Sequence, residues 1–262
     1  MLGLEVRKTF LRLRAVTFVV VALLPVAILT FRALAHVMSS DRSPDPIGEV
    51  VQTYGVVFQL FFLRFVVYFG CFGIFTYLVR GELLERSLHF YFLAPMRREV
   101  FVIGKYVAGL IAGTVLFGAS VIAQLFVLFL PQATQGGWSY LLSKPGLAAA
   151  AAYLGVTVLG VAGYGALFLA LGALVRHPMI PAAILYGWEW ANFLLPSFLK
   201  KLSVIHHLQS LCPVPVPSGP FALPAEPTPP WLAVLGLVLV IAALLIFGAR
   251  RARRLEVTYA SE

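Results

Sequence analysis

Residues 53–79 read TYGVVFQLFFLRFVVYFGCFGIFTYLV, an apolar run that contains one charged residue, Arg64. A transmembrane helix needs about 20 predominantly apolar residues to cross roughly 30 Å of hydrocarbon. Further runs of this kind occur at residues 15–35, 101–130, 147–175, 179–199 and 231–249. The sequence therefore predicts an all-α integral membrane protein, with six transmembrane helices in a single domain, residues 1–262.

The overall composition supports this class. Hydrophobic residues make up 60% of the chain and charged residues 12%, whereas soluble domains contain about 25% charged residues. The mean hydropathy is +0.91. Three of the runs, the second, third and fourth, exceed the minimum length, so we expect them to tilt, extend beyond the bilayer or include interfacial turns.

The distribution of Lys and Arg predicts the orientation, because cytoplasmic flanks carry the excess of these residues. Cations gather before the first run, after the second and after the last: Arg7, Lys8, Arg12, Arg14, Arg80, Arg86, Arg97, Arg98, Arg250, Arg251, Arg253 and Arg254. Six spans place all three groups on one side, so both termini are expected in the cytoplasm. The net charge of +9 does not indicate nucleic-acid binding, since these cations flank spans and form no continuous basic face.

The N-terminal region allows two interpretations. Residues 2–14 carry an apolar stripe and basic residues, which fits an interfacial helix on membrane lipids or a merely basic flank. Ala33-Leu34-Ala35 also resembles a signal-peptide cleavage site, and cleavage would leave five spans. We expect the first span to be retained, because Arg32 interrupts the approach to that site.

Two ionisable side chains, Arg64 and Glu189, lie deep within apolar runs. Each costs roughly 2.5–3.5 kcal/mol at the bilayer centre on insertion scales, so each should face protein or water. At about 1.5 Å per residue, their depths match within side-chain reach. We hypothesise that they pair, or contact polar partners along a central path, near Trp188, Trp190 and Asn192. A structural ion pair that fixes helix register is the alternative.

Sequence motifs for catalysis and metal binding are weak or absent. The chain has no GxxxxGK[ST] phosphate loop, no HExxH and no GxSxG, so we predict no catalytic site and no ATPase site of its own. The adjacent His206 and His207, with Cys212 nearby, are a weak metal signal without a further ligand, and we predict no metal. Gly109 and Gly113 stand at GxxxG spacing, which favours close helix packing within the subunit.

A short amphipathic helix is predicted in the charged segment between the second and third runs. Its polar residues alternate with leucines over Glu82, Leu83, Leu84, Glu85, Arg86, Ser87 and Leu88. Paired acids and bases favour a soluble protein partner, whereas an anionic lipid surface would not favour Glu82 and Glu85.

At these residues the chain resembles the permease subunits of type 2 ABC exporters. The matching residues are Gly81-Glu82, Glu85-Arg86-Ser87, Leu93-Ala94-Pro95, Arg97 and Gly104-Lys105. A second resemblance lies in Trp188-Glu189, Leu195-Pro196, Ser203, His206-His207 and Leu211. The six-span layout with cytoplasmic termini is similar over the rest of the chain.

The resemblance implies a permease of the bacterial inner membrane that forms a homodimer, or pairs with a related permease, and binds two separately encoded ATPase subunits. ATP and Mg²⁺ would bind to those partners, and this chain would hold no cofactor. The resemblance places Glu82 to Leu88, Pro95 and Arg97 at the ATPase contact, and Arg64 and Glu189 near the transport path. It leaves the cargo open.

Other functions also stay open. An ATP-independent secondary transporter or channel would use Arg64 and Glu189 for ion coupling. A membrane enzyme would need a constellation around His89, His206 or His207, and a scaffold within a larger membrane complex would need none.

Overall fold

The computed structural model describes residues 13–38, 46–84, 98–133, 136–175, 177–216 and 228–253. All regular secondary structure within these ranges is helical. Five helical segments of the described chain are long and apolar enough to cross a membrane. They are α2 (Leu13–Met38), the continuous segment of α3 (Ile47–Val57), η1 (Phe58–Val67) and α4 (Tyr68–Leu84), α6 (Arg98–Phe129), α8 (Lys144–Leu174) and α12 (Pro230–Arg253). The architecture is that of an integral membrane protein.

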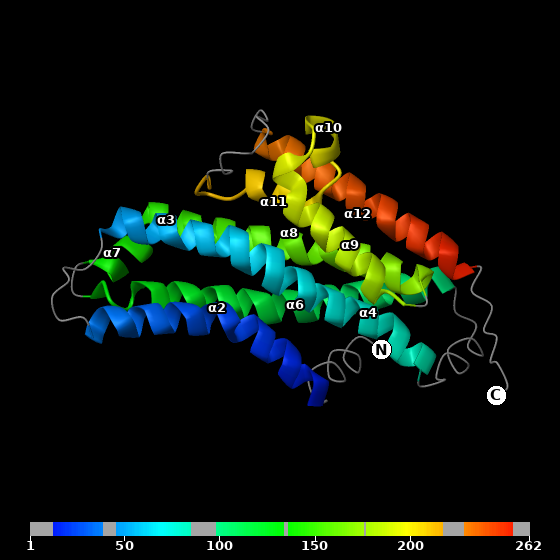
Figure 1. Cartoon of the computed structure of the whole chain (residues 1–262), viewed down its shortest axis with the longest axis horizontal. Coiled ribbons are helices and arrows are strands. Elements are labelled where there is room, and N and C mark those ends of the chain that lie inside the picture. Colours follow the sequence, from blue (N-terminus) through cyan, green and yellow to red (C-terminus); the bar gives the residue numbers. More distant parts are fainter. Residues whose placement is uncertain are drawn as a thin grey trace.

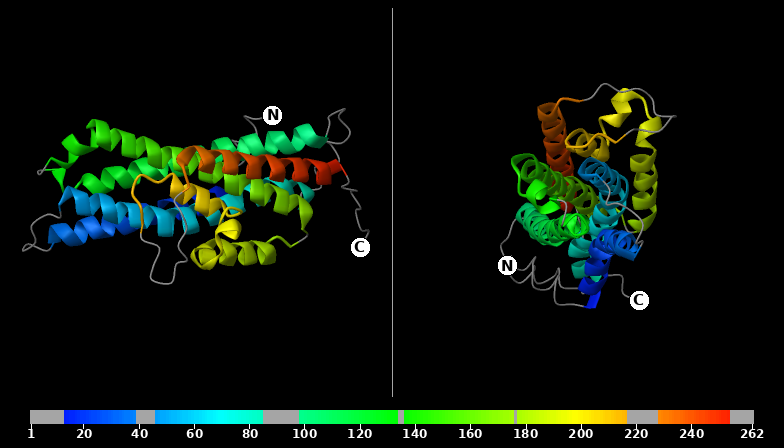
Figure 2. Two further views of the ribbon diagram at one scale, coloured as in Figure 1. Left: turned by 90° about the horizontal axis from the view of Figure 1, so that it is seen from above. Right: turned by 90° about the vertical axis from the view of Figure 1, so that its left-hand side faces the viewer.

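The long helices run side by side and give an elongated bundle (Figures 1 and 2). Helix α8 contacts α4, α6 and α12, and α2 packs against α6 and η1. Figure 1 shows α12 and α4 ending at the same end of the bundle, and α2 ending at the opposite end, where α3 begins. The short α7 (Gly137–Leu141) lies at the opposite end, between α6 and α8.

The structure does not confirm the expected sixth span over residues 179–199, because these residues do not form one continuous helix. Helix α9 (Met179–Trp190) has 12 residues, which cover only about 18 Å. It is followed by η3 (Ala191–Leu194), α10 (Ser197–Lys200) and α11 (Val204–Ser210). Leu195 is extended, with ψ 149°, because a residue that precedes a proline avoids the helical region. The proline Pro196 therefore ends a run that hydrophobicity alone made continuous.

Glycines let the helices approach closely, as expected for GxxxG spacing. A Cβ at Gly109 would lie 2.6 Å from the Phe75 ring of α4, and one at Gly113 would lie 2.7 Å from Val161 of α8. These contacts are within the subunit, which confirms the prediction of intrasubunit packing.

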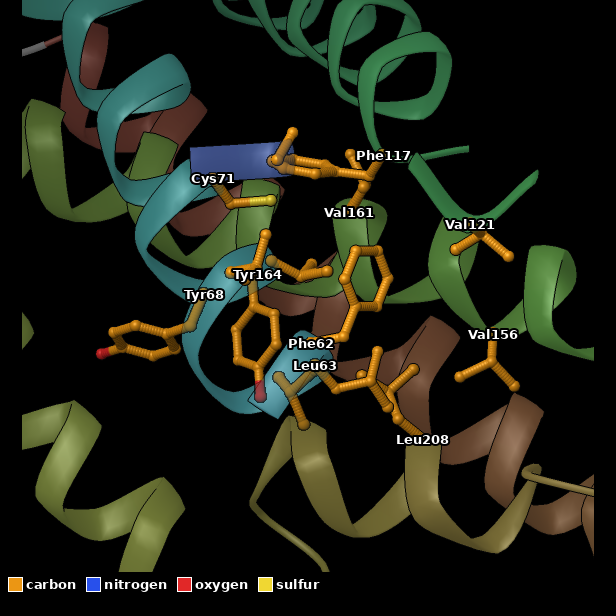
Figure 3. Packing of buried hydrophobic residues seen from close by; sticks show 14 of the residues in the cluster. Phe62, Leu63, Tyr68, Cys71, Phe117, Val121, Val156, Val161, Tyr164 and Leu208 are labelled. Carbon is orange, nitrogen blue, oxygen red and sulfur yellow. The ribbon is translucent and has the colours of Figure 1, made fainter. Parts of the chain in front are cut away.

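Aromatic residues fill the space between the helices. The close-up in Figure 3 shows Phe62 and Phe117 directed toward the same interior region as Tyr164. All three side chains are fully buried, and the rings of Phe62 and Phe117 meet edge to face at 6.4 Å. Tyr164 lies against Tyr68 at 5.2 Å in the same kind of contact. This arrangement suits the ring quadrupoles better than face-to-face stacking.

Helix α2 contains Pro25 and is bent along its length (Figure 1). A proline removes one helical hydrogen bond and frees carbonyl groups in the preceding turn. Ser120 of α6 donates its hydroxyl to the carbonyl oxygen of Ala22 in that turn, and Gln124 donates to Ser120 at 3.1 Å. Neighbouring polar groups therefore stabilise the bend.

Several predicted elements lie outside the described residues. They are residues 2–12 of the N-terminal interfacial helix and, in the charged segment, Glu85, Arg86, Ser87, Leu88, Pro95 and Arg97. The backbone of residues 81–84, including Glu82 and Leu83, continues α4.

Candidate functional site

The chain after α8 is divided into α9, η3, α10 and α11, and we call residues 179–210 the interrupted segment. Three polar side chains of the α3–η1–α4 segment bind this segment or the residues just after it. Gln59 donates from Nε2 to the carbonyl oxygen of Val214 at 2.6 Å, and Arg64 donates from Nη1 to that of Trp190 at 2.9 Å. Tyr68 donates its hydroxyl to the carbonyl oxygen of Ala182 at 2.7 Å. One continuous helix therefore fixes α9 and the chain after α11 through backbone carbonyls far apart in sequence.

The middle of this helix is a π-helix of 10 residues, η1. π-helices are rare and occur mostly as short stretches, frequently at functional sites. Their i→i+5 hydrogen bonds widen the turn, so side chains five residues apart come closer to one face than in an α-helix. Gln59 and Arg64 have this spacing, and both bind the chain that follows α8, Arg64 at the end of α9 and Gln59 just beyond α11. The π-helix thus helps to aim the two side chains.

Glu189 accepts hydrogen bonds from the free backbone N–H groups at the beginning of α11. Its carboxylate accepts hydrogen bonds from the backbone N–H groups of Val204 at 3.1 Å and Ile205 at 2.9 Å. It also accepts from the Ser203 hydroxyl at 2.9 Å and from the Tyr164 hydroxyl at 3.2 Å. The first N–H groups of a helix have no intrahelical partner and carry partial positive charge, so a carboxylate stabilises them. Glu189 is 6% exposed and acts as a buried cap.

Arg64 and Glu189 were hypothesised to pair, and the structure gives them different hydrogen-bond partners. Arg64 holds the carbonyl oxygen of Trp190, the residue next to Glu189, while the Glu189 carboxylate holds the start of α11. Both side chains therefore form hydrogen bonds with backbone groups that the interruption of the helix leaves without a helical partner. Irregular backbone at membrane depth is tolerated only where protein or a water-filled cavity satisfies it.

The other predicted residues near Glu189 separate into two environments. Asn192 is 4% exposed, whereas Trp190 is 55% exposed and Trp188 is half-buried. The predicted polar and aromatic face of this segment is therefore divided, with the amide inside the protein and Trp190 outside.

Three buried polar atoms around the interruption have no hydrogen-bond partner in the structure: Arg64 Nε, Asn192 Nδ2 and His207 Nδ1. The first two are donors. His207 Nε2 lies 2.9 Å from the carbonyl oxygen of Lys201, so Nε2 carries the proton and Nδ1 is an acceptor. Such groups suit binding of a polar molecule, and buried water also satisfies them.

Burial disfavours the charged forms of the imidazole of His206 in α11 and of the thiol of Cys212 just after it. Burial, with His207, Lys200 and Lys201 nearby, lowers the pKa of His206 to about 4. Burial raises the pKa of the Cys212 thiol to about 12, and the thiolate is the reactive and metal-binding form. Within the described residues no three His, Cys, Asp or Glu side chains gather to hold a metal.

The sequence identified Arg64 and Glu189 as buried ionisable residues. It did not identify Gln59, Tyr68 and Tyr164, whose side chains also form hydrogen bonds at this site. Gln59 was visible as a polar interruption in residues 53–79. The two tyrosines gave no signal, because a tyrosine in an apolar helix is equally compatible with plain packing. Searches of known protein families and of characterised proteins gave no match for this chain.

Proposed function

We propose that this chain is the transmembrane permease subunit of an ABC transporter, and that it works as an exporter. The observation that carries the proposal is the interrupted segment α9–α11, held by polar side chains against a π-helix. Membrane transporters place helix interruptions of this kind where cargo binds and where helices move. A plain membrane scaffold needs no such interruption.

Energy is proposed to come from separately encoded ATPase subunits, because this chain contains no phosphate loop. The ATPase would dock on the charged segment that begins in the last turn of α4, through Glu82, Leu83, Glu85 to Leu88, Pro95 and Arg97, and would bind ATP and Mg²⁺. Helix α4 runs on from η1 to Leu84 without a break. The 21 residues from Arg64 to Leu84 form a rod of about 30 Å, which suits the transmission of movement between the two sites.

A second permease subunit is proposed to cover α9. This helix carries exposed apolar side chains at Ile180 and Ile184, each 69% exposed, and at Trp190. The first two stand one turn apart on the same face. The partner is either an identical chain or a related permease, and lipid would cover the same face in an isolated subunit.

The decisive experiment is coexpression with a candidate ABC ATPase subunit from the same organism, followed by copurification and an ATPase assay. We expect a stable complex, and transport that requires the ATPase. Replacing Glu82, Glu85 and Arg86 together by Gln should lower the coupled activity and leave membrane insertion unchanged. Glu49→Gln is the matched control, because Glu49 is an exposed acid at the start of α3, far along the chain from the docking segment.

Two results would contradict the proposal. Transport that persists without the ATPase would favour the secondary transporter or channel. Equal loss of activity in the triple variant and in Glu49→Gln would show that general surface charge, and not docking, sets the rate.

A further inference from the structure

The short helix α10 and the turn that follows it carry their apolar and polar side chains in an inverted arrangement. Phe198 is 69% exposed and Leu202 is 70% exposed, whereas Lys200 between them is 5% exposed and Ser203 is fully buried. On a protein surface that faces water, apolar side chains are mostly turned inward and lysine is turned outward. The reverse arrangement indicates that α10 faces an apolar medium.

The contacts of α11 place α10 near the edge of the membrane. His206 of α11 lies, through Nε2, 3.2 Å from the hydroxyl of Thr228, which stands just before the spanning helix α12 begins at Pro230. A Cβ at Gly236, in the second turn of α12, would lie 2.7 Å from the His207 ring. Only a short turn separates α10 from α11. Helix α10 therefore lies close to the level at which α12 enters the bilayer.

Two exposed side chains at this level are typical of a membrane interface. Trp231, in the first turn of α12, is exposed, and tryptophan gathers where acyl chains meet headgroups. Lys201, directly after α10, is also exposed, and a lysine beside apolar side chains extends its ammonium group toward the polar headgroups. The backbone of Lys201 is fixed, since His207 donates from Nε2 to its carbonyl oxygen at 2.9 Å.

The chemistry of this surface favours lipid over a protein partner. Figure 2 shows α9 and α10 at the edge of the bundle, which lipid and other proteins can both reach. Protein interfaces are poor in lysine, yet Lys201 adjoins the exposed Phe198 and Leu202. Lipid phosphates complement the charge of Lys201, and the acyl chains next to them complement the two apolar side chains.

We propose that α10 is an interfacial anchor, which inserts Phe198 and Leu202 among the acyl chains of the leaflet where α12 begins and binds lipid phosphate through Lys201. The anchor holds the interrupted segment in the membrane where its helix is broken. Opening of α11 then withdraws two apolar side chains from lipid, which costs free energy in proportion to their area. This surface is distinct from the face of α9 assigned to a second permease subunit, and the proposal does not depend on an ATPase.

Spin labels on the full chain, in nanodiscs of phosphatidylglycerol and phosphatidylethanolamine, test where α10 lies. In a background of Cys71→Ala and Cys212→Ser, one label is attached through Phe198→Cys, Lys201→Cys, Leu235→Cys or Glu49→Cys. Leu235 is an exposed apolar residue of α12 and reports lipid, and Glu49 is an exposed acid at the start of α3 and reports water. Electron paramagnetic resonance measures collisions with oxygen, which dissolves in lipid, and with a water-soluble nickel chelate.

We expect the label at Phe198 to collide more often with oxygen than with the nickel chelate, as the label at Leu235 does. The label at Lys201 should lie between the two controls. Lys201→Glu should shift the label at Phe198 toward the behaviour of the label at Glu49, because a carboxylate is repelled by phosphate. Lys144→Glu is the charge control and should leave it unchanged, since Lys144 is an exposed cation at the start of α8.

Hydrogen exchange measures how strongly α10 anchors the segment. Phe198→Ser with Leu202→Ser should speed up exchange in α11 by about tenfold, the factor expected when one apolar side chain loses its apolar surroundings. Phe198→Leu with Leu202→Ile keeps the apolar surface and should keep exchange slow. Phe247→Ser is the matched control, because Phe247 is an exposed phenylalanine in the last part of α12, away from α10.

Frequent collisions of the label at Phe198 with the nickel chelate would overturn the proposal and show that α10 faces water. Rare collisions with both reagents would also overturn it, because a protein such as the second permease subunit would then cover α10. Exchange in α11 that is as fast in Phe247→Ser as in the double serine variant would show that α10 anchors nothing.

Discussion

Helix α8 and the segment from Met179 to Ser210 are both rich in apolar residues, yet α8 is one helix of 31 residues and the other segment is divided into four. Helix α8 begins with Ser143 as its N-cap and Pro145 in its first turn, and its interior then contains no further proline. The other segment contains Asn192 and Pro196 in the middle of its run. The hydrophobicity of each run predicts that both lie in the membrane. Whether a helix continues is decided by single residues, here by Pro196, which cannot donate a backbone hydrogen bond.

The two regions also satisfy their backbone groups differently. Inside α8 the i→i−4 hydrogen bonds satisfy the backbone without help from other helices. The interrupted segment depends on side chains instead: Arg64 of η1 binds the carbonyl of Trp190, and Glu189, which lies within the segment, binds the amides of Val204 and Ile205. Substitutions of these two residues should therefore damage the interrupted segment and leave α8 intact.

The largest effect is expected for Glu189→Leu. This change leaves two backbone N–H groups and two hydroxyl groups of the interior without their acceptor, and each buried unsatisfied group costs about 1–3 kcal/mol. Four such groups at the low end of this range predict a loss of about 4 kcal/mol, measured by thermal unfolding in detergent. Hydrogen exchange should speed up at Val204 and Ile205 and stay slow in the middle of α8.

Glu189→Gln is the control for this prediction, because an amide oxygen still accepts hydrogen bonds while the charge is lost. It should cost clearly less than Glu189→Leu. If the two variants are equally stable, or if exchange in α8 rises in parallel with that in α11, Glu189 is not a local cap and the contrast between the two regions fails.

The next effect in size concerns Arg64. Arg64→Met removes the hydrogen bond to Trp190, and a hydrogen bond to a charged group contributes about 1.5–3 kcal/mol. The exchange variant, Arg64→Glu with Glu189→Arg, should be no more stable than either single change, because the two side chains serve different backbone groups. Unfolding midpoints of the three variants in detergent measure this. Recovery of stability in the exchange variant would instead demonstrate direct pairing.

The sequence predicted the long helices well, because their apolar runs are long and well separated. The fourth run, residues 147–175, corresponds to α8 at Lys144–Leu174, and the third, residues 101–130, corresponds to α6 at Arg98–Phe129. The π-helix could not be predicted, since residues 58–67 are apolar on nearly all sides and show no period that separates a π-helix from an α-helix.

The site was predicted in part. Arg64 and Glu189 stood out because ionisable residues within apolar runs need partners. Their partners stayed hidden, because they are backbone groups that become available only where the helix ends. Pro196 was the visible signal of that end, and the apolar residues around it obscured its meaning. The docking residues after α4 remain a prediction.

A smaller effect separates two glycines within α8. A Cβ at Gly165 would lie 2.4 Å from the Phe75 ring, whereas nothing lies within 4 Å of one at Gly155. Gly165→Ala should lower stability by about 1–3 kcal/mol through overpacking. Gly155→Ala should be neutral, or stabilising by up to about 1 kcal/mol through helix propensity. Thermal unfolding of both variants measures the difference, and equal midpoints would show that α8 can move away from α4 at little cost.

The smallest effect is a pH dependence in α11, which is not one of the spanning helices. His206 lies 3.2 Å from the Thr228 hydroxyl, and burial, with His207, Lys200 and Lys201 nearby, lowers its pKa from 6.5 to about 4. Between these values the unfolded chain binds more protons than the folded one, so stability should fall as the pH drops from about 6.5 to about 4 and level off below. Burial also lowers the pKa of His207, which acts in the same direction.

Because His206 is only half-buried, solvent screens part of this effect, and the unfolding midpoint, measured as a function of pH, should decrease by a few degrees at most (~2–4 °C). His206→Gln should flatten this decrease, whereas Thr228→Val removes the hydrogen bond without removing the titrating group and should keep it. A midpoint that rises toward pH 4, or an unchanged slope in His206→Gln, would show that α11 accepts protons as readily when folded as when unfolded. In that case the polar contacts of α11 tolerate added charge, and the contacts of Arg64 and Glu189 are what distinguish the interrupted segment from α8.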